Sequence, residues 1–159
     1  MTTHMSIPAL EQHPFVAGLS PRHVQTLARL ANPVHFAKDH VIFREGEHSQ
    51  EFYLIVSGPV SLEVTLPRGV LQVQRLGAGD GLGWSSTLVG RGKHFQARAL
   101  NDVDALAFHG PQVLAACQED PEFGFAFMVR MLDVVSKRLQ ATRVQLADMY
   151  SPVARQAGV

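Results

Sequence analysis

The chain has only one cysteine, Cys117, among its 159 residues. It therefore cannot form an internal disulfide framework or a zinc site built from several cysteines, and it suits a reducing cytoplasm. Long apolar runs are also missing, since none reaches the roughly 18 residues that a membrane-spanning helix needs. The N-terminal MTTHMSIPALEQHPF has neither the basic start nor the apolar core of a signal peptide. We therefore expect a cytoplasmic protein with no membrane contact.

An excess of either charge is equally absent. Lysine plus arginine and aspartate plus glutamate number 14 each, which gives a formal net charge of zero. No overall field therefore draws the chain toward nucleic acid or anionic lipid. Hydrophobic residues make up 46% and charged residues 18%, which is typical of a folded domain rather than a disordered chain. At this length we expect one domain with a sizeable core.

Helix and strand signals occupy different parts of the chain. The segment LSPRHVQTLARLANP predicts a helix, with Ser20 as its N-cap, Pro21 at its first position and a stop at Asn32-Pro33. Between about residues 34 and 109, short runs rich in β-branched and aromatic residues alternate with glycine and proline turns. Several short strands at this spacing predict an antiparallel jelly-roll barrel, or β-roll.

The last third of the chain predicts a pair of helices. PQVLAACQE forms the first, and Asp120-Pro121 starts a second that we expect to run to about Tyr150, with Ser151-Pro152 as its stop. Apolar residues recur along it at steps of three and four with one polar interruption: Phe125, Met128, Leu132, Val135, Leu139, Thr142, Leu146 and Met149. A helix of about 30 residues spans ~45 Å. Because a small barrel needs less cover, we expect the distal half to pair with a second copy; the alternative is a helix that lies on its own barrel.

Together these segments predict an α+β domain over residues 15–150, with the β-roll at about 34–109 and the helix pair at about 111–150. Residues 1–14 form an extension and residues 151–159 a tail. Three stretches, VIFREGEHSQEFYLIVSGPVSLEV, LGAGDGLG and ARAL, together with this order of elements, resemble the cyclic-nucleotide-binding domain family. That family includes catabolite activator proteins and regulatory subunits of cyclic-nucleotide-dependent kinases. The resemblance implies a ligand-sensing regulatory module without catalytic activity.

The resemblance places the ligand site in the glycine-rich segment GDGLGWSSTLVGRGKHFQARA, residues 79–99. In relatives that bind cyclic AMP or cyclic GMP, a glutamate follows the second glycine, and an arginine further along holds the cyclic phosphate. Here Trp84 follows Gly83, and Lys93 stands in the arginine slot. An indole donates a hydrogen bond but cannot accept one from the ribose hydroxyl. A lysine carries the charge without the two-pronged geometry of a guanidinium.

The segment nevertheless retains groups that bind anions. Backbone amides at a helix start, serine hydroxyls and nearby cations all suit an anion, and His94 can assist when it is protonated. The predicted ligand-binding residues are Gly81, Leu82, Gly83, Trp84, Ser85, Ser86, Arg91, Lys93, His94 and Phe95. Trp84 has three open roles: it stacks on a planar ligand, fills the pocket itself or packs in the core. We expect no cofactor and a small anionic ligand, either a cyclic nucleotide such as cyclic AMP or another anionic metabolite.

Two other functions stay open. A pocket filled by Trp84 would make the chain a ligand-free pseudo-domain that acts in dimeric protein–protein contact. The other is a cupin-like metal site, with His48 and Glu51 before a strand and His109 as a distant third ligand, although the chain contains no His-x-His pair. Enzyme activity has no support, because no serine has an evident base and Cys117 in VLAACQE is typical of a buried core residue.

Many members of the similar family carry a DNA-binding helix-turn-helix domain after the long helix. Only SPVARQAGV follows that helix here, which is too short for such a module. We therefore expect no nucleic-acid binding through this chain. The resemblance implies that the terminal helices close over the pocket, and a ligand can drive this only if it prefers one helix arrangement. The signal would then pass through a homodimer to a downstream protein that the sequence does not identify.

Overall fold

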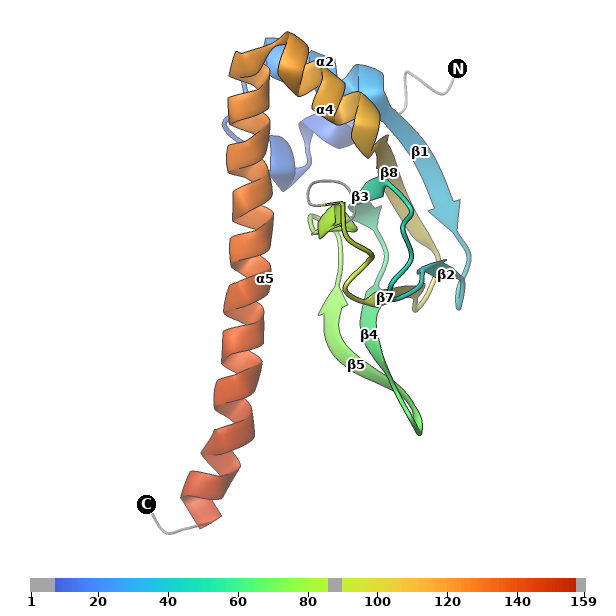
Figure 1. The fold of residues 1–159 in the computed structure, drawn as a ribbon, viewed down its shortest axis with the longest axis vertical. Helices are drawn as coiled ribbons and strands as arrows, with labels where there is room; N and C mark the ends of the chain where they lie inside the picture. Colours follow the sequence, from blue (N-terminus) through green and yellow to red (C-terminus); the bar gives the residue numbers. More distant parts are fainter. Residues whose placement is uncertain (1–7, 86–89, 157–159) are drawn as a thin grey trace.

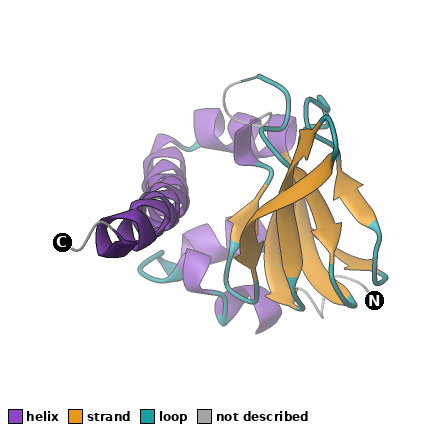
Figure 2. Ribbon diagram, turned by 90° about the horizontal axis from the view of Figure 1, so that it is seen from below, coloured by secondary structure: helices purple, strands orange, loops and turns teal. Residues whose placement is uncertain are grey.

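A computed structural model describes residues 8–85 and 90–156, with side chains up to Tyr150. Two four-stranded antiparallel sheets form the β-roll, in the strand orders β1-β8-β3-β6 and β2-β7-β4-β5. The strands are β1 Ala31–Phe36, β2 Val41–Phe43, β3 Glu51–Ser57, β4 Val60–Leu66, β5 Gly69–Leu76, β6 Gly81–Leu82, β7 Gln96–Ala99 and β8 Val103–His109. Figure 2 shows the strands gathered on one side and the helices on the other.

The helices come from both ends of the chain. The 3₁₀ turn η1 Pro14–Val16 and helix α2 Pro21–Leu30 precede the roll, and α4 Gly110–Glu119 and α5 Pro121–Gln156 follow it. Figure 1 shows α2 and α4 together at one end of the molecule, from which α5 runs alongside the roll. No helix among the described residues combines the length and the apolar character that a membrane crossing requires. The predicted α+β class, with a β-roll between an N-terminal helix and a C-terminal helix pair, is confirmed.

Two helix starts follow from local sequence signals, as predicted. The side chain of Ser20 accepts a hydrogen bond from the backbone N–H of His23 at 3.3 Å, and Pro21 occupies the first helical position. At the start of α5, Asp120 Oδ1 accepts from the N–H of Phe123 at 3.3 Å. Each cap satisfies a backbone donor that the first helical turn leaves without a partner.

Three predicted boundaries differ from the structure. Asn32-Pro33 lies within β1, so the roll begins at residue 31; β1 is an edge strand, where a proline does not disrupt the ladder. Helix α5 continues through Ser151-Pro152 to Gln156, although a proline inside a helix removes one N–H donor and crowds the carbonyl of the preceding turn. The described part of the predicted extension, residues 8–14, contributes to the core, since Leu10 is 0% exposed.

The apolar core has two parts. One cluster fills the roll, and the other packs the helices against the sheet of β3 and β8. The rings of Phe15 and Phe127 meet edge to face with centroids 5.7 Å apart. Phe123 and Phe127 are 0% and 1% exposed, whereas Phe125 between them is 75% exposed. The start of α5 is therefore fixed to the roll along one helix face, and Phe125 is left on another.

Glu63 on β4 is the buried acidic group of the roll, 2% exposed. Arg98 on β7 donates to both of its carboxylate oxygens, from Nη2 at 2.6 Å and from Nε at 3.3 Å. Gln96 Nε2 and Ser61 Oγ each donate to the same carboxylate at 3.0 Å. The hydrogen bond from Arg98 holds the pKa of Glu63 below its ordinary value of 4.5. This network ties β4 to β7 through side chains as well as through the backbone ladder.

Replacement of this carboxylate should destabilise the fold in a pH-dependent way. Glu63→Gln leaves Arg98 without its anion, which should lower the free energy of unfolding at pH 7 by roughly 2 kcal/mol. Because the pKa is lower in the folded state, the wild-type contribution is present above pH 4.5 and is lost as the pH falls below it. Denaturant unfolding should therefore show a larger difference in the free energy of unfolding between the wild type and Glu63→Gln at pH 7 than at pH 3. Equal stabilities at pH 7 would contradict this, and Glu119→Gln on the exposed face of α4 is the matched control.

Candidate functional site

Most of the predicted ligand residues surround one small cavity, called here the cassette cavity. Arg138 of α5 and two roll residues, Phe43 and Leu62, complete a lining that contains seven of the predicted residues: Leu82, Gly83, Trp84, Ser85, Lys93, His94 and Phe95. The cavity measures about 20 Å³, which is room for about one water molecule. In this conformation the cassette cavity is therefore nearly closed.

The remaining predicted residues lie elsewhere. Gly81 lines a neighbouring cleft between the roll and α5. Arg91 is exposed, and it is absent from the cassette lining among the described residues. Ser86 lies outside the described residues. Of the two predicted cations, Arg91 and Lys93, the structure places Lys93 in the lining of the cassette cavity.

Lys93 is turned into the protein, with only 2% of its surface exposed. Its ammonium donates to the backbone carbonyls of Glu51 and Gly83, both at 2.7 Å, and lies 5.0 Å from the ring centroid of Phe43. Burial lowers the pKa of Lys93 to about 8, against an opposing effect of Glu51 and Glu47. Two of its three donors are thus directed at neutral oxygens of the chain itself.

Gly83 makes this arrangement of Lys93 possible. Its φ of +87° lies in the left-handed region that favours glycine. A Cβ at this position would lie 2.9 Å from the carbonyl oxygen of Glu51 and 3.1 Å from Lys93 Nζ. Any larger residue would therefore push the ammonium away from its two carbonyl partners.

Trp84 joins the cassette to the helical part of the core. Its half-buried ring packs against the cluster beneath the helices and meets the ring of His94 edge to face, with centroids 5.5 Å apart. Residues 84 and 85 are helical, and Ser85 Oγ donates to the carbonyl of Gly92 at 3.4 Å. Of the three roles left open for Trp84, these contacts support packing in the core, and its place in the lining of the small cassette cavity is consistent with filling of the pocket.

A larger cleft, called here the α5 cleft, lies between α5 and the roll. It measures about 400 Å³ and is lined by the N-terminal turn, by β5, by residues 79–81 and by one face of α5. Its polar and charged lining residues are His13, Gln74, Arg75, Asp80, Asp133, Lys137, Arg138 and Gln145. The α5 cleft is thus far roomier than the cassette cavity.

Arg138 lines both cavities and connects α5 to the roll. Its Nη2 donates to the carbonyl of Gly81 at 2.5 Å, and its Nη1 donates to Gln74 Oε1 at 3.2 Å. Gln74 Nε2 returns a hydrogen bond to Thr142 Oγ1 at 3.0 Å. Gln145 also donates to the carbonyl of Val73. Burial lowers the pKa of Arg138 from its ordinary value, so this cation is held in a poorly solvated place.

Arg138 was missed in the sequence, although a signal was present. Phe127, Met131 and Val134 precede it at steps of four and three, which places a cation on the apolar face of α5.

His13 was also missed, because it lies in the stretch that was predicted as an extension. Its Nδ1 accepts from the N–H of Phe15 at 3.1 Å and its Nε2 donates to the carbonyl of Ile55 at 2.9 Å, while burial lowers its pKa.

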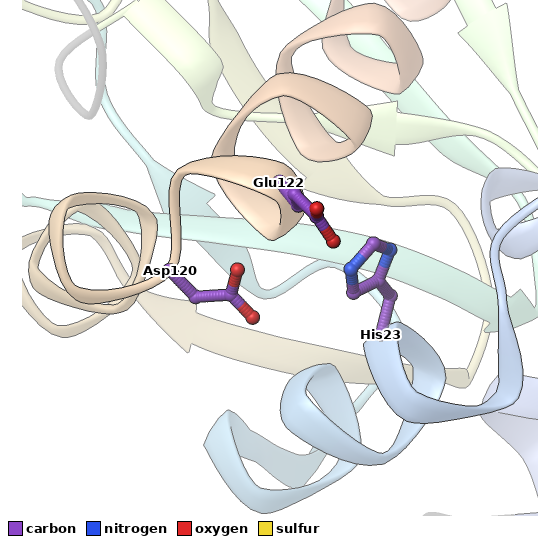
Figure 3. Close-up of side chains that lie close together, drawn as sticks. All are labelled: His23, Asp120 and Glu122. Atoms are coloured by element: carbon purple, nitrogen blue, oxygen red, sulfur yellow. The ribbon is translucent and has the colours of Figure 1, made fainter.

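The predicted cupin-like ligands are only partly brought together. Glu51 Oε1 and His109 Nδ1 lie 3.3 Å apart, but His48 is exposed. Among residues 8–85 and 90–156, a different group has ligand atoms within 4.8 Å of one another: His23, Asp120 and Glu122. Figure 3 shows these side chains pointing toward one another between α2 and the start of α5.

A guanidinium already neutralises this group. Arg22 forms ion pairs with Asp120 at 2.5 Å and with Glu122 at 3.1 Å, and its Nη2 donates to His23 Nε2 at 3.1 Å. All three potential metal ligands therefore accept from one cation that the chain itself supplies. We interpret the cluster as an ion-pair network that fastens α2 to the start of α5.

The predicted dimer residues of α5 fall into two groups. Four are exposed: Leu132 at 67%, Leu139 at 69%, Leu146 at 52% and Met149 at 72%. The others are engaged with the chain itself or less exposed. Met128 packs against the helical core and Val135 is half-buried, while Thr142 accepts from Gln74. The predicted polar interruption at Thr142 is thus a contact to the roll.

Comparison with known proteins agrees with this fold. The profile of the family described as "Cyclic nucleotide-binding domain" matches residues 33–120. The CRP-like cAMP-activated global transcriptional regulator of Mycobacterium tuberculosis is 26% identical over 133 residues, which is 83% of this chain and 58% of the relative. The chain therefore spans little more than half the length of this curated relative.

Solved structures show the same architecture. A cyclic nucleotide-binding domain from Methylobacillus flagellatus superposes with a TM-score of 0.80 at 17% identity, over 92% of this chain and 83% of that one. The catabolite activator protein of Thermus thermophilus superposes with a TM-score of 0.70 at 25% identity, over 86% and 62% respectively. The fold expected from the sequence is thus found in proteins of the similar family.

The buried position of Lys93 can be tested by titration. Its side chain should lose its proton near pH 8. The chain has only three lysines, so the ¹³Cε resonance that disappears in Lys93→Met is the resonance of Lys93. Between about pH 8 and 10.5 the unfolded chain keeps a proton that the native state has released. The wild type should therefore gain free energy of unfolding across this interval, and Lys93→Met should not.

The matched control is Lys38→Met, which removes an exposed ammonium. It should leave the pH dependence of stability unchanged. A Lys93 resonance that titrates above pH 10 would show that the ammonium is solvated and would contradict the closed cassette.

Proposed function

Because this chain belongs to the cyclic nucleotide-binding domain family, we propose that it is a non-catalytic sensing module for a small anionic or phosphate-bearing ligand. The observation that carries the proposal is the position of Arg138. Its guanidinium lines the cassette cavity and the α5 cleft together, and it comes from the helix that would transmit the signal. A ligand bound beside residues 81–95 would therefore contact the roll and α5 at once.

Transmission requires that the ligand prefer one arrangement of α5 over another. The described hydrogen bonds from α5 to β5 and β6 depend on a few polar side chains, chiefly Arg138 and Gln74. A bound anion that competes for the guanidinium weakens its bond to Gly81. The ligand thus changes how α5 is held, without any chemical step.

The ligand class follows from the cassette. The M. tuberculosis relative is named as cAMP-activated, which supports cyclic AMP as one candidate. Trp84 and Lys93 replace the glutamate and arginine expected in such sites, so another anionic metabolite is the second candidate. The single cysteine, Cys117, lies on α4 outside both cavities, and burial raises the pKa of its thiol, which keeps it in the unreactive form.

A homodimer through α5 is part of the proposal. Phe125, Leu132, Leu139 and Leu146 follow one another at intervals of seven, and each is at least half exposed. This stripe lies on a different helix face from Phe127 and Met131, which are buried against the rest of the chain. A second copy would cover it, and a cytoplasmic protein partner would read the signal from the paired helices.

The closed cassette favours a second candidate function, a ligand-free domain that acts in dimeric contact. Lys93 stands where the family holds the ligand phosphate, but its ammonium already donates to two carbonyls of the chain itself. It therefore needs no ligand to satisfy these donors. The cavity of about 20 Å³ leaves no space for a nucleotide without rearrangement. Ligand titration separates the two functions directly.

Cyclic AMP should change the fluorescence of Trp84, the single tryptophan of the chain, in a saturable way. At a hundred times its dissociation constant it should stabilise the native state by about 2.7 kcal/mol and raise the thermal midpoint by roughly 5–10 °C. Adenosine, which lacks the phosphate, is the control and should do neither. If neither signal changes at millimolar cyclic AMP, that ligand is excluded; if other anionic metabolites also fail, the ligand-free function replaces the sensing one.

Disruption of the exposed stripe should separate the two copies. Leu132→Glu combined with Leu139→Glu places four carboxylates along the paired helices, so sedimentation equilibrium should give a monomer mass for the variant and a dimer mass for the wild type. Gln140→Glu adds a carboxylate at an exposed position outside the stripe and should remain dimeric. A monomeric wild type at high micromolar concentration would refute the dimer.

A further inference from the structure

We propose that the anion of the ligand is bound by Arg138 in the α5 cleft, and not by Lys93 in the cassette cavity. This inference rests on the proposed sensing function and assigns its binding site. It moves the key cation from the roll, where the resemblance to the family placed it, to the long helix. Three observations support this assignment: the hydrogen bonds that already occupy Lys93, the volume of the α5 cleft and the neutral acceptors of Arg138.

Lys93 is poorly placed to receive an anion. Two of its donors point at the carbonyls of Glu51 and Gly83, at 2.7 Å each, and the surrounding cavity holds only about 20 Å³. The carbonyls are part of the backbone at β3 and at the Gly83 turn, so they cannot turn aside as a side chain would. An anion at this point would meet two carbonyl oxygens as well as the ammonium.

The α5 cleft has the space that the cassette lacks. Its volume of about 400 Å³ lies in the range of about 300–1,000 Å³ typical of small-molecule pockets. Apolar side chains of α5, including Val134, Ala141 and Val144, line it beside polar groups of the roll. Such a mixed lining suits an organic molecule with one charged group rather than a bare inorganic ion.

Two cations of this cleft, Arg75 and Arg138, have no described ion pair, and of these two Arg75 is exposed whereas Arg138 is half-buried. The described acceptors of Arg138 are the neutral oxygens of Gly81 and Gln74, and within residues 8–85 and 90–156 it forms no ion pair. Lys137, by contrast, is paired with Asp133 at 3.0 Å. The charge of Asp80 acts favourably on the half-buried guanidinium of Arg138, but burial is the larger effect and lowers its pKa. An incoming anion would therefore compensate the guanidinium further through a charge-assisted hydrogen bond.

The remaining charges of the cleft restrict the ligand class. Asp80 lines the same space, and its carboxylate accepts from the N–H of Gly77 at 2.9 Å. It would repel a ligand with several negative charges and would accept hydrogen bonds from hydroxyl or amino groups. The chemistry therefore favours a monoanionic phosphate ester of nucleotide size that carries such donors.

The test compares four variants with cyclic AMP as the probe, by isothermal titration calorimetry below the thermal midpoint of every variant. Arg138→Gln should weaken binding about 10- to 100-fold, as expected for loss of hydrogen bonds to a charged group. Arg138→Lys, which keeps the charge but not the fork, should fall between wild type and Arg138→Gln. Lys93→Met and the exposed control Arg143→Gln should change affinity by less than about threefold.

A spectroscopic measurement on the wild type avoids any dependence on how well the variants fold. Cyclic AMP should shift the ¹⁵Nε resonance of Arg138 in a saturable way and leave the ¹³Cε resonance of Lys93 nearly unchanged. If Lys93→Met abolishes binding while Arg138→Gln keeps it, the site is the cassette; the inference fails and the sensing function stands. If the wild type binds neither cyclic AMP nor other phosphate monoesters, the inference and the sensing function fail together.

Discussion

The guanidinium of Arg138 joins α5 to the roll. It is the point where a helix that follows the last strand meets β5 and β6, through the carbonyl of Gly81 and the side chain of Gln74. Apolar contacts of Phe123, Phe127 and Met131 fix the first part of the helix, as far as Val134. Beyond them, the described contacts of α5 with the roll are mostly polar, so they are directional and open to competition by a ligand. A helix held in this way can respond to what binds beside it.

The altered cassette is consistent with that role for α5. Gly83 permits the close approach of Lys93, Lys93 satisfies two backbone carbonyls, and Trp84 fills the space toward the helices. Trp84 and Lys93, which stand in place of the expected glutamate and arginine, make contacts within the chain where those residues would contact a nucleotide. Buried cations are costly unless they are hydrogen-bonded, so the two carbonyls explain how Lys93 is tolerated. Contacts within the chain thus close the cassette, whereas the α5 cleft keeps a volume of about 400 Å³.

Features encoded by neighbouring residues were predictable from the sequence. The N-caps Ser20 and Asp120, the order of strands and turns, and the gathering of Trp84, Lys93 and His94 follow from local patterns and from the family resemblance. Features that depend on distant partners were not. Arg138 meets Gly81 across 57 positions and His13 meets Ile55 across 42, and local periodicity does not indicate such partners. The end of α5 was also misjudged, since Pro152 resembles a stop in sequence.

Hydrogen exchange along α5 tests most directly whether Arg138 holds the helix on the roll. The backbone amides of residues 131–142 should exchange faster in Arg138→Gln than in the wild type. Without the hydrogen bonds to Gly81 and Gln74, local opening of this part of α5 costs less free energy. The amides of residues 121–127, anchored by buried phenylalanines, should be unaffected, and Arg143→Gln should match the wild type throughout. Equal exchange of residues 131–142 in Arg138→Gln and Arg143→Gln would show that apolar packing alone positions α5.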